Sequence, residues 1–216
     1  MQLSAKKVLI TAGPTREPID PVRYISNFST GKMGFALAEE CVRRGAEVTL
    51  IKGPTTSKPE NDQIHVVNVT TAAEMYEACS QYFDESDVII FAAAVADYTP
   101  KQPANTKIKK KENDFMLELV KTKDIAYELG KVKKAGHIHV GFALETDNEM
   151  DNALSKLEKK NLDMIVLNSL QDAGAGFQHD TNKITIVDKS RNVVKFELKS
   201  KAEVAADIIN YIQKLS

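Results

Sequence analysis

The chain has 216 residues, and 43% of them are hydrophobic, which is enough for one sizeable core. Its net charge of −1 and its pI of about 6.4 exclude a protein that attracts nucleic acid through a globally basic surface. No apolar run is long enough for a signal peptide or a membrane span, so we expect a cytoplasmic protein with neither nucleic acid nor membrane as a partner.

Strand and helix signals alternate along the chain. Short apolar runs predict strands over residues 6–13, 46–53, 86–97, 136–145 and 162–169. Apolar residues at helical spacing predict helices over residues 31–45, 72–83, 147–161 and 201–215. Residues 182–200 alternate in polarity across a turn at Lys189–Asn192, which predicts a C-terminal hairpin. This order predicts a single α/β domain over residues 1–216, in which a Rossmann-like, mostly parallel sheet carries helices on both faces.

Cysteine and histidine form no recognisable catalytic or metal-binding pattern. Cys41 and Cys79 both fall in predicted helices, where a buried, reduced thiol is the expected state. The four histidines, at positions 65, 137, 139 and 179, have neither the spacing of a metal site nor a nucleophile as partner. We therefore expect structural or surface histidines, and the sequence leaves any metal ligands unassigned.

The long loop that follows the first predicted strand, residues 13–30, is the first candidate site. In parallel sheets, ligands bind beyond the carboxyl ends of the strands. The loop ends in a Gly-Lys pair, Gly31-Lys32, but a P-loop has a Ser or Thr after this pair and an earlier glycine separated from the pair by four residues. The dinucleotide fingerprint G-x-G-x-x-G is absent as well. We therefore predict a functional loop of another type, without secondary structure and stiffened by prolines.

This loop can bind phosphate without a P-loop. Ser29, Thr30 and Gly31 directly precede a predicted helix, whose free amide groups and dipole attract an anion. The alternative is that Ser29 or Thr30 only caps the helix and that Asn27 only makes a turn. The local pattern leaves both interpretations open.

Two further segments carry lysines near the same edge of the predicted sheet. The third predicted strand leads into Asp97 and then into a loop with a lysine run between residues 107 and 111. If that run is extended, Lys107 and Lys109 share a face and suit a triphosphate. The alternative is a solvated, charged edge, which is the commoner role of such a run. Lys156 and Lys160 are four residues apart in a predicted helix and therefore lie on one face.

Five segments resemble, in the same order, phosphopantothenoylcysteine synthetase, the coenzyme A enzyme that joins 4'-phosphopantothenate to cysteine. They read TAGPTREPIDPVRYISNFSTGKMG, AAAVADY, KIKK, VGFALET and KLEKKNLDMIVLN. The match spans nearly the whole chain. The sequence resembles the bacterial enzymes, which use CTP, rather than the eukaryotic enzymes, which use ATP. In many bacteria this domain follows a flavin-dependent decarboxylase. Because the chain opens almost directly on the first predicted strand, we expect a stand-alone synthetase without flavin.

The resemblance implies a two-step reaction. The carboxylate of 4'-phosphopantothenate attacks the α-phosphate of CTP, which gives an acyl-cytidylate and pyrophosphate. The amine of L-cysteine then attacks the acyl carbon, which gives the amide and CMP. Because the phosphorylated substrates are strongly anionic, we expect cationic side chains, backbone amides and Mg²⁺ (or Mn²⁺) at the site. The family further implies a homodimer.

The same resemblance implies roles for individual residues. Asn27 matches the family's catalytic asparagine, whose amide holds the acyl oxygen or orients the incoming amine, and the catalytic group also includes Arg23 and Lys107. Nucleotide contacts are implied for Asp97, Lys107, Asp124, Ile125, Phe142, Lys156 and Lys160. Contacts with substrate or phosphate groups are implied for Gly13, Ser29, Thr30, Gly31, Lys32 and Ala93. Thr122-Lys123 stands where the family has Asn-Pro, so around Asp124 we carry over backbone contacts only.

Three alternatives remain. The first is the same ligation with ATP. The second is a Rossmann-type nicotinamide-dependent reductase, which is disfavoured because the glycine fingerprint is missing and residues 49–55 offer no acidic side chain for a ribose. The third is a nucleotide-binding module without activity, which is disfavoured because Asn27 and Arg23 share one proline-rich loop.

Overall fold

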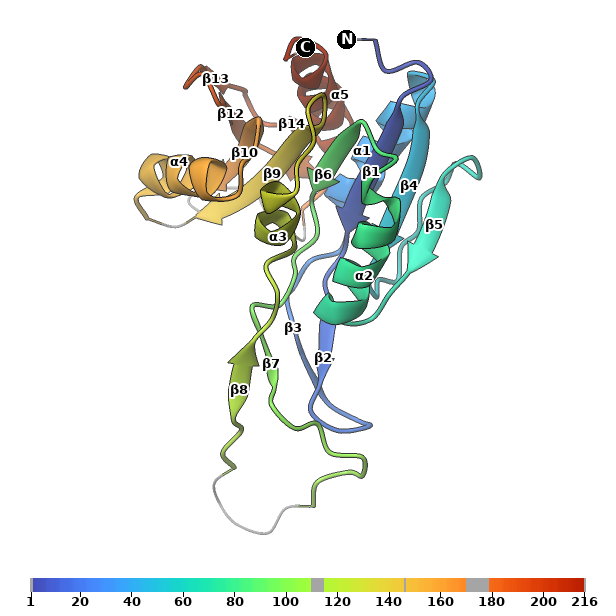
Figure 1. Cartoon of the computed structure of the whole chain (residues 1–216), viewed down its shortest axis with the longest axis vertical. Helices are drawn as coiled ribbons and strands as arrows, with labels where there is room; N and C mark the ends of the chain where they lie inside the picture. Colours follow the sequence, from blue (N-terminus) through green and yellow to red (C-terminus); the bar gives the residue numbers. More distant parts are fainter. Residues whose placement is uncertain (1, 110–114, 146, 170–178, 216) are drawn as a thin grey trace.

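The computed structural model describes residues 2–109, 115–145, 147–169 and 179–215, and an eight-stranded sheet runs through its centre (Figure 1). The strands from β10 to β5 are parallel, and β12 and β13 form an antiparallel hairpin at one edge. In the order in which they pair, the strands are β13 (Val193–Lys195), β12 (Ile184–Asp188), β10 (Met164–Ser169), β9 (Ile138–Glu145), β6 (Val88–Phe91), β1 (Lys7–Ala12), β4 (Glu47–Lys52) and β5 (His65–Asn68).

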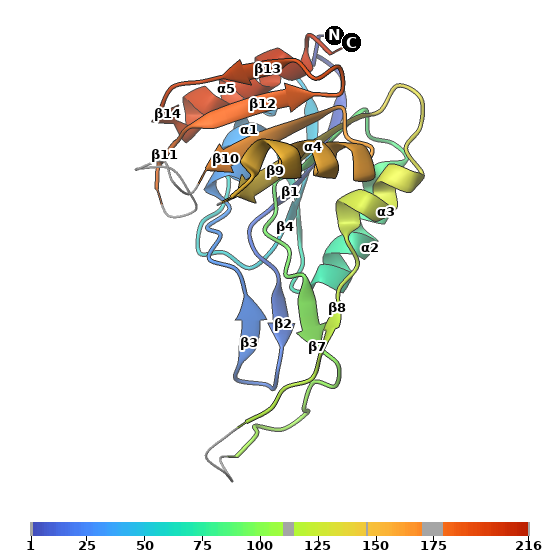
Figure 2. The same ribbon diagram turned by 90° about the vertical axis from the view of Figure 1, so that its left-hand side faces the viewer.

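Helices cover both faces of this sheet (Figures 1 and 2). In the described residues they are α1 (Lys32–Arg43), α2 (Ala72–Phe83), α3 (Ile125–Lys131), α4 (Glu149–Lys159) and α5 (Lys201–Ile212). Residues of α1 and α5 belong to one buried apolar cluster, and residues of α2, α3 and α4 belong to a second. The predicted α/β class, the mostly parallel sheet and the C-terminal hairpin are therefore confirmed.

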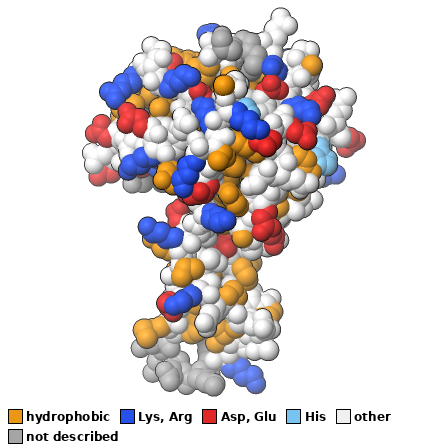
Figure 3. Space-filling view, viewed as in Figure 1, with side chains coloured by type: hydrophobic (Ala, Val, Ile, Leu, Met, Phe, Trp, Pro, Cys, Tyr) orange, Lys and Arg blue, Asp and Glu red, His pale blue; other side chains and the backbone are white. Residues whose placement is uncertain are grey.

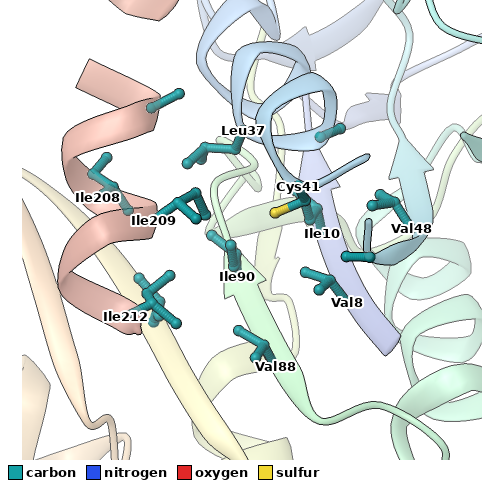
Figure 4. Close-up of a cluster of buried hydrophobic side chains, with 14 of the residues drawn as sticks. Val8, Ile10, Leu37, Cys41, Val48, Val88, Ile90, Ile208, Ile209 and Ile212 are labelled. Carbon is teal, nitrogen blue, oxygen red and sulfur yellow. The ribbon is translucent and has the colours of Figure 1, made fainter. Parts of the chain in front are cut away.

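Alternation along the strands builds these two cores. Val8 and Ile10 of β1 point toward α1 and α5, whereas Leu9 between them points to the opposite face. Figure 4 shows the first core, in which Leu37 of α1 and Ile209 of α5 meet above β1 and β6. All five of these side chains are buried, so the central strands are apolar on both faces, as is typical of parallel sheets.

Local sequence signals define the helix ends. Thr71 caps α2 and Ser200 caps α5, each in a capping box with the glutamate three residues later. Gly45 follows α1 with a φ of +82°, which is the left-handed conformation predicted for a glycine after a helix.

The predicted third strand, residues 86–97, is too long. Its paired part, β6, ends at Phe91, and the following residues bond instead to the loop after β1. The amide of Ala94 donates to the carbonyl of Gly13 (2.9 Å), and the amide of Ala96 donates to the Thr15 hydroxyl (3.0 Å). The apolar run continues past Phe91 without a change of pattern, so the sequence does not reveal where the chain leaves the sheet.

The loop of residues 13–30 was predicted to lack secondary structure, and this prediction is wrong. It contains an antiparallel hairpin of β2 (Arg16–Pro18) and β3 (Tyr24–Ser26). The Asp20 carboxylate closes the turn by accepting hydrogen bonds from the amides of Val22 and Arg23, both at 2.9 Å. The strands are too short to produce a periodic signal.

Other short elements were also not predicted. These are β5, α3, the pair β7 (Tyr98–Pro100) and β8 (Leu119–Lys121), and the pair β11 (Thr181–Asn182) and β14 (Lys199–Ser200). Each has seven residues or fewer, so neither period two nor period 3.6 is distinctive.

Two hairpins project beyond the sheet and form an arm, which comprises residues 16–26 and the described part of 98–121 (Figure 2). The amide of Ala104 donates to the carbonyl of Ile19 (2.9 Å), and the amide of Ile108 donates to the Asp20 carboxylate (3.1 Å). The loop that carries Lys107 is thereby held against the tip of the β2–β3 hairpin.

We predict that Ile209→Ala lowers the free energy of unfolding by about 2–5 kcal/mol, because it opens a cavity between α5 and α1. Urea denaturation followed by circular dichroism measures the change. The control is Val194→Ala on exposed strand β13, which should change stability by less than about 0.5 kcal/mol. Equal losses in the two variants would contradict the packing of α5.

Candidate active site

A cavity of about 390 Å³ opens beyond the carboxyl ends of β1, β6, β9 and β10. Its volume is in the range of small-molecule sites, and its location is where open α/β sheets bind ligands. Of the predicted site residues, it is lined by Asn27, Ser29, Thr30, Gly31, Lys32, Ala93, Asp97, Asp124, Ile125, Phe142, Lys156 and Lys160. The cavity thus brings together segments that are far apart in the sequence.

The start of α1 forms one wall. Gly31 occupies the N-cap position with a φ of +78°, so no side chain caps the helix. Ser29 instead accepts a weak hydrogen bond from the Gly31 amide at 3.3 Å. A Cβ atom at Gly34 would lie 2.5 Å from that of Ala12, so glycine lets α1 approach the end of β1. The first-turn amides of α1, which have no partner within the helix, therefore border the cavity.

Asn27 is fixed beside the chain that leaves β6. Its amide nitrogen donates to the carbonyls of Ala94 (3.0 Å) and Val95 (3.1 Å). Ser26 supports the same junction by donating to the carbonyl of Thr15 at 2.7 Å. The side chain of Asn27 is thus oriented by two contacts, although the residue itself is exposed.

Lysine side chains of the cavity pair with carboxylates. Lys156 lies 2.5 Å from Glu145, Lys160 lies 2.9 Å from Asp124, and Lys32 lies 2.5 Å from Asp180. Each pair has at least one partly exposed partner, so each contributes only about 0–1 kcal/mol to stability. Such pairs can exchange the carboxylate for a phosphate at small cost.

Asp124 has a structural function besides this ion pair. Its carboxylate accepts a hydrogen bond from the Tyr127 amide at 3.1 Å and so caps α3. Lys123, one of the two residues that depart from the family pattern, lines the cavity, and its ammonium group lies 4.4 Å from the centre of the Tyr76 ring.

Three predicted site residues do not line the cavity in the described part of the chain: Gly13, Arg23 and Lys107. The carbonyl of Gly13 accepts a hydrogen bond from the amide of Ala94. Arg23 is held on the arm by the Asp20 carboxylate and by the carbonyl of Ile108 (3.1 Å). Lys107 and Lys109 are exposed, no strand includes them, and the rest of the lysine run lies outside the described residues. The roles of these three residues stay predictions.

The sequence analysis missed Asn168, Asn182 and Lys201, which also line the cavity. Asn168 lies near the end of β10, and its buried amide oxygen has no hydrogen-bond partner among the described residues. Its position near the carboxyl end of a predicted strand could have identified it as a candidate site residue. For Lys201, the signal was a basic residue at the first position of a predicted helix, where acidic residues are favoured.

The cysteines and histidines lie elsewhere. Cys41 and Cys79 are fully buried free thiols in α1 and α2, and burial raises the pKa of each to about 12. His139 is buried against Phe83 and Phe91, and burial lowers its pKa to about 3. Within the described chain, none of these groups lines the cavity, so the predicted structural character of the thiols and of His139 is confirmed.

Comparisons with known proteins agree on one family. The model of the DNA/pantothenate metabolism flavoprotein C-terminal domain matches residues 3–215. A protein of an unknown prokaryotic organism, named cysteine/cysteine sulfinic acid decarboxylase, is 58% identical over 99% of this chain and 59% of its own length. The coenzyme A biosynthesis bifunctional protein CoaBC of Bacillus subtilis is 47% identical over 99% of this chain and 52% of its own length. The chain thus spans between about half and three fifths of these relatives.

A solved structure agrees as well. The crystal structure of the C-terminal domain of coenzyme A biosynthesis bifunctional protein CoaBC is 42% identical, covers 98% of each chain and superposes with a TM-score of 0.83. No helix in the described part of our chain is long and apolar enough to cross a membrane. The chain belongs to the DNA/pantothenate metabolism flavoprotein C-terminal domain family, which confirms the resemblance to phosphopantothenoylcysteine synthetase that its motifs carry.

Proposed function

We propose that the chain is a ligase that joins 4'-phosphopantothenate to L-cysteine in coenzyme A biosynthesis and uses CTP to activate the acid. The observation that carries this proposal is the convergence of three separate motifs, represented by Asn27, Asp97 and Lys160, on one cavity. The names of the coenzyme A biosynthesis relatives support the same pathway. We further propose that residues 1–216 act as one domain in the cytoplasm.

The physical task of such a cavity is to bring together two anionic substrates, 4'-phosphopantothenate and CTP. In the first step, a carboxylate oxygen bonds to the α-phosphorus of CTP, and the bond from that phosphorus to the leaving pyrophosphate breaks. In the second step, the cysteine nitrogen bonds to the acyl carbon and loses a proton, and CMP leaves. Lys156, Lys160 and the first-turn amides of α1 supply the positive charge and the donors that both steps require.

The contacts of Asn27 favour one of its two proposed roles. The two hydrogens of its amide nitrogen are directed to the carbonyls of Ala94 and Val95. The amide oxygen is left as an acceptor. An acceptor suits the N–H of an incoming amine, whereas it would repel an acyl oxygen. We therefore propose that Asn27 orients the cysteine amine.

A magnesium ion fits this cavity as an ion held largely by the substrate. Among the described residues, no three His, Cys, Asp or Glu side chains cluster as a metal site. Mg²⁺ commonly uses one or two carboxylates together with water and substrate phosphates. The exposed Asp97, which lines the cavity, is the carboxylate that we propose for it. When bound, the ion shields phosphate charge.

The name of the 58% identical relative raises a second candidate, the decarboxylation of cysteine or a related amino acid. That protein is longer than the part that matches our chain. The cavity favours the ligase, because Lys32, Lys156 and Lys160 all line it. A free amino acid offers no polyphosphate for such a set of cations, whereas CTP does.

We also propose that the protein acts as a homodimer through its arm. Figure 3 shows hydrophobic side chains on the surface of the arm. The arm and the adjoining Phe28 expose large apolar side chains. They are Val22, Tyr24, Phe28, Tyr98, Phe115, Met116, Leu119 and Val120. Phe28 is 82% exposed and Met116 is 94% exposed, and patches of this kind are typical of interfaces. If a second copy binds there, Arg23 and Lys107 can contribute to the cavity of the partner.

We predict that CTP is preferred over ATP by at least about 100-fold in kcat/KM. The polar groups of a pocket that pairs with cytosine stay unpaired when a purine is bound. Pyrophosphate release with 4'-phosphopantothenate and L-cysteine measures both values. Omission of 4'-phosphopantothenate is the control and should abolish release. Equal values for the two nucleotides contradict the base preference, and no product with either nucleotide contradicts the ligase.

We predict that Asn27→Ala slows transfer to cysteine by about 10²–10³, because one preorganised group is lost. Activation continues, so the acyl-cytidylate accumulates. A single-turnover quench with labelled CTP and mass detection measures the intermediate. Asn61→Ala, outside the cavity, is the matched control. If Asn27→Ala abolishes pyrophosphate release, Asn27 acts in the first step instead.

We predict that Leu119→Asp converts the dimer to an inactive monomer, because it places a charge in the apolar surface of the arm. Light scattering measures the mass, and Val193→Asp on exposed strand β13 is the control that should remain dimeric. A fully active wild-type monomer contradicts the proposal.

A complementation test asks whether the arm serves the partner's cavity. Arg23→Ala and Asn27→Ala are each expected to have little activity alone. In a mixed dimer, one cavity combines an intact Asn27 with the other protomer's intact Arg23, so activity returns. No recovery after subunit exchange means that both residues serve the same protomer.

A further inference from the structure

Lys201 is a buried lysine in the wall of the cavity. It is the first residue of α5, and only 8% of its surface is exposed. Its ammonium group donates to the carbonyl of His179 at 2.5 Å, and its amide donates to the carbonyl of Asp180 at 3.0 Å. Removing an ammonium group from water is costly, so a lysine in this position calls for an explanation.

Two features near Lys201 oppose its positive charge, whereas the charge of Asp180 favours it. The N-terminal end of α5 carries a partial positive charge from the helix dipole. Lys32, on the neighbouring helix α1, adds a second cation. Burial, and then the charge of Lys32, lower the pKa of Lys201. A local conflict of this kind, at the edge of a cavity, is a common feature of functional sites.

The fold holds both lysines firmly. β11 pairs with β14, which leads directly into Lys201, and α5 packs along α1, which begins at Lys32. Buried Asn182 of β11 lines the same end of the cavity. The Lys32 ammonium pairs with Asp180, whose side chain is 85% exposed, so this bond is weak and is easily replaced.

We propose that Lys201 and Lys32 bind the terminal phosphates of the nucleoside triphosphate and retain the pyrophosphate as it leaves. This inference rests on the proposed function, and it adds Lys201 as a nucleotide-binding residue. Two ammonium groups beside the uncapped start of α1 match the charge of two linked phosphates better than that of a single phosphate ester. The Asp180 carboxylate pairs with the Lys32 ammonium until the phosphates replace that carboxylate.

A structural alternative has to be separated from this role. Lys201 could act only as a clip that holds residues 179–180 through their carbonyls. Lys201→Gln tests this, because an amide can still donate to the His179 carbonyl but carries no charge. Lys201→Arg keeps the charge. Lys214→Gln removes the same charge from the exposed chain just beyond the end of α5 and is the matched control.

Calorimetric titration with CTP, CMP, inorganic pyrophosphate and 4'-phosphopantothenate tests the proposal on the intact protein. We expect Lys201→Gln to weaken CTP and pyrophosphate about 10- to 100-fold, the range of a lost charge-assisted hydrogen bond, and CMP less than about twofold. Lys201→Arg should stay within about threefold of wild type, and Lys214→Gln should equal it. If Lys201→Gln does not fold, as thermal melting would reveal, Lys32→Gln should show the same selective loss.

The other outcomes overturn the proposal in distinguishable ways. Equal weakening of CTP and CMP, or no change in either, means that Lys201 is only a clip. A loss confined to 4'-phosphopantothenate means that the lysines hold the other substrate. If wild type binds CTP through Lys201 but forms no amide with cysteine, the ligase proposal fails and the phosphate site stands. If wild type binds no nucleotide, both fail.

Discussion

The loop after β1 is tied by hydrogen bonds to the chain that leaves β6, and the rest of the site depends on this junction. β1 lies where the strand order reverses, with β4 on one side and β6 on the other. The amide of Ala94 bonds to Gly13, and Asn27 bonds back to Ala94. Because both segments are fixed there, Asn27 is held beside the strand ends, where it lines the cavity although it remains exposed. The same loop then delivers the start of α1 to the cavity.

Electrostatics prepares this cavity for a polyanion before any ligand arrives. Lys32, Lys156 and Lys160 are held by carboxylates that remain partly exposed, so the cations are oriented but only weakly neutralised. Orientation in advance lowers the reorganisation that binding or reaction requires. A fully buried pair would orient the lysines as well, but it would cost far more to break. Weak, exposed pairing therefore suits the exchange of charged substrates that we propose for this site.

Long, strongly patterned elements were predictable from the sequence, and tertiary hydrogen bonds account for much of the rest. The helices α1, α2, α4 and α5 and the central strands follow from apolar periodicity. The end of β6 did not, because the apolar run continues beyond Phe91 into the residues that bond to Gly13. Twelve of the fifteen predicted site residues line one cavity, mainly because their motifs lie at strand and helix ends. Lys201 was missed because its neighbours in space, including Lys32, are distant in sequence.

The arm explains why one short motif carries two residues that do not meet. Arg23 and Asn27 are separated by β3, and four extended residues span about 13 Å. Asn27 lines the cavity, whereas Arg23 is fastened to Asp20 and to the backbone of Ile108 on the arm. Bringing Arg23 back to the same cavity would break these bonds and pull the arm from its hairpin partner. An exposed, apolar arm that carries its own cations is better suited to another molecule's cavity, and this supports the proposal that two copies complete each other's sites.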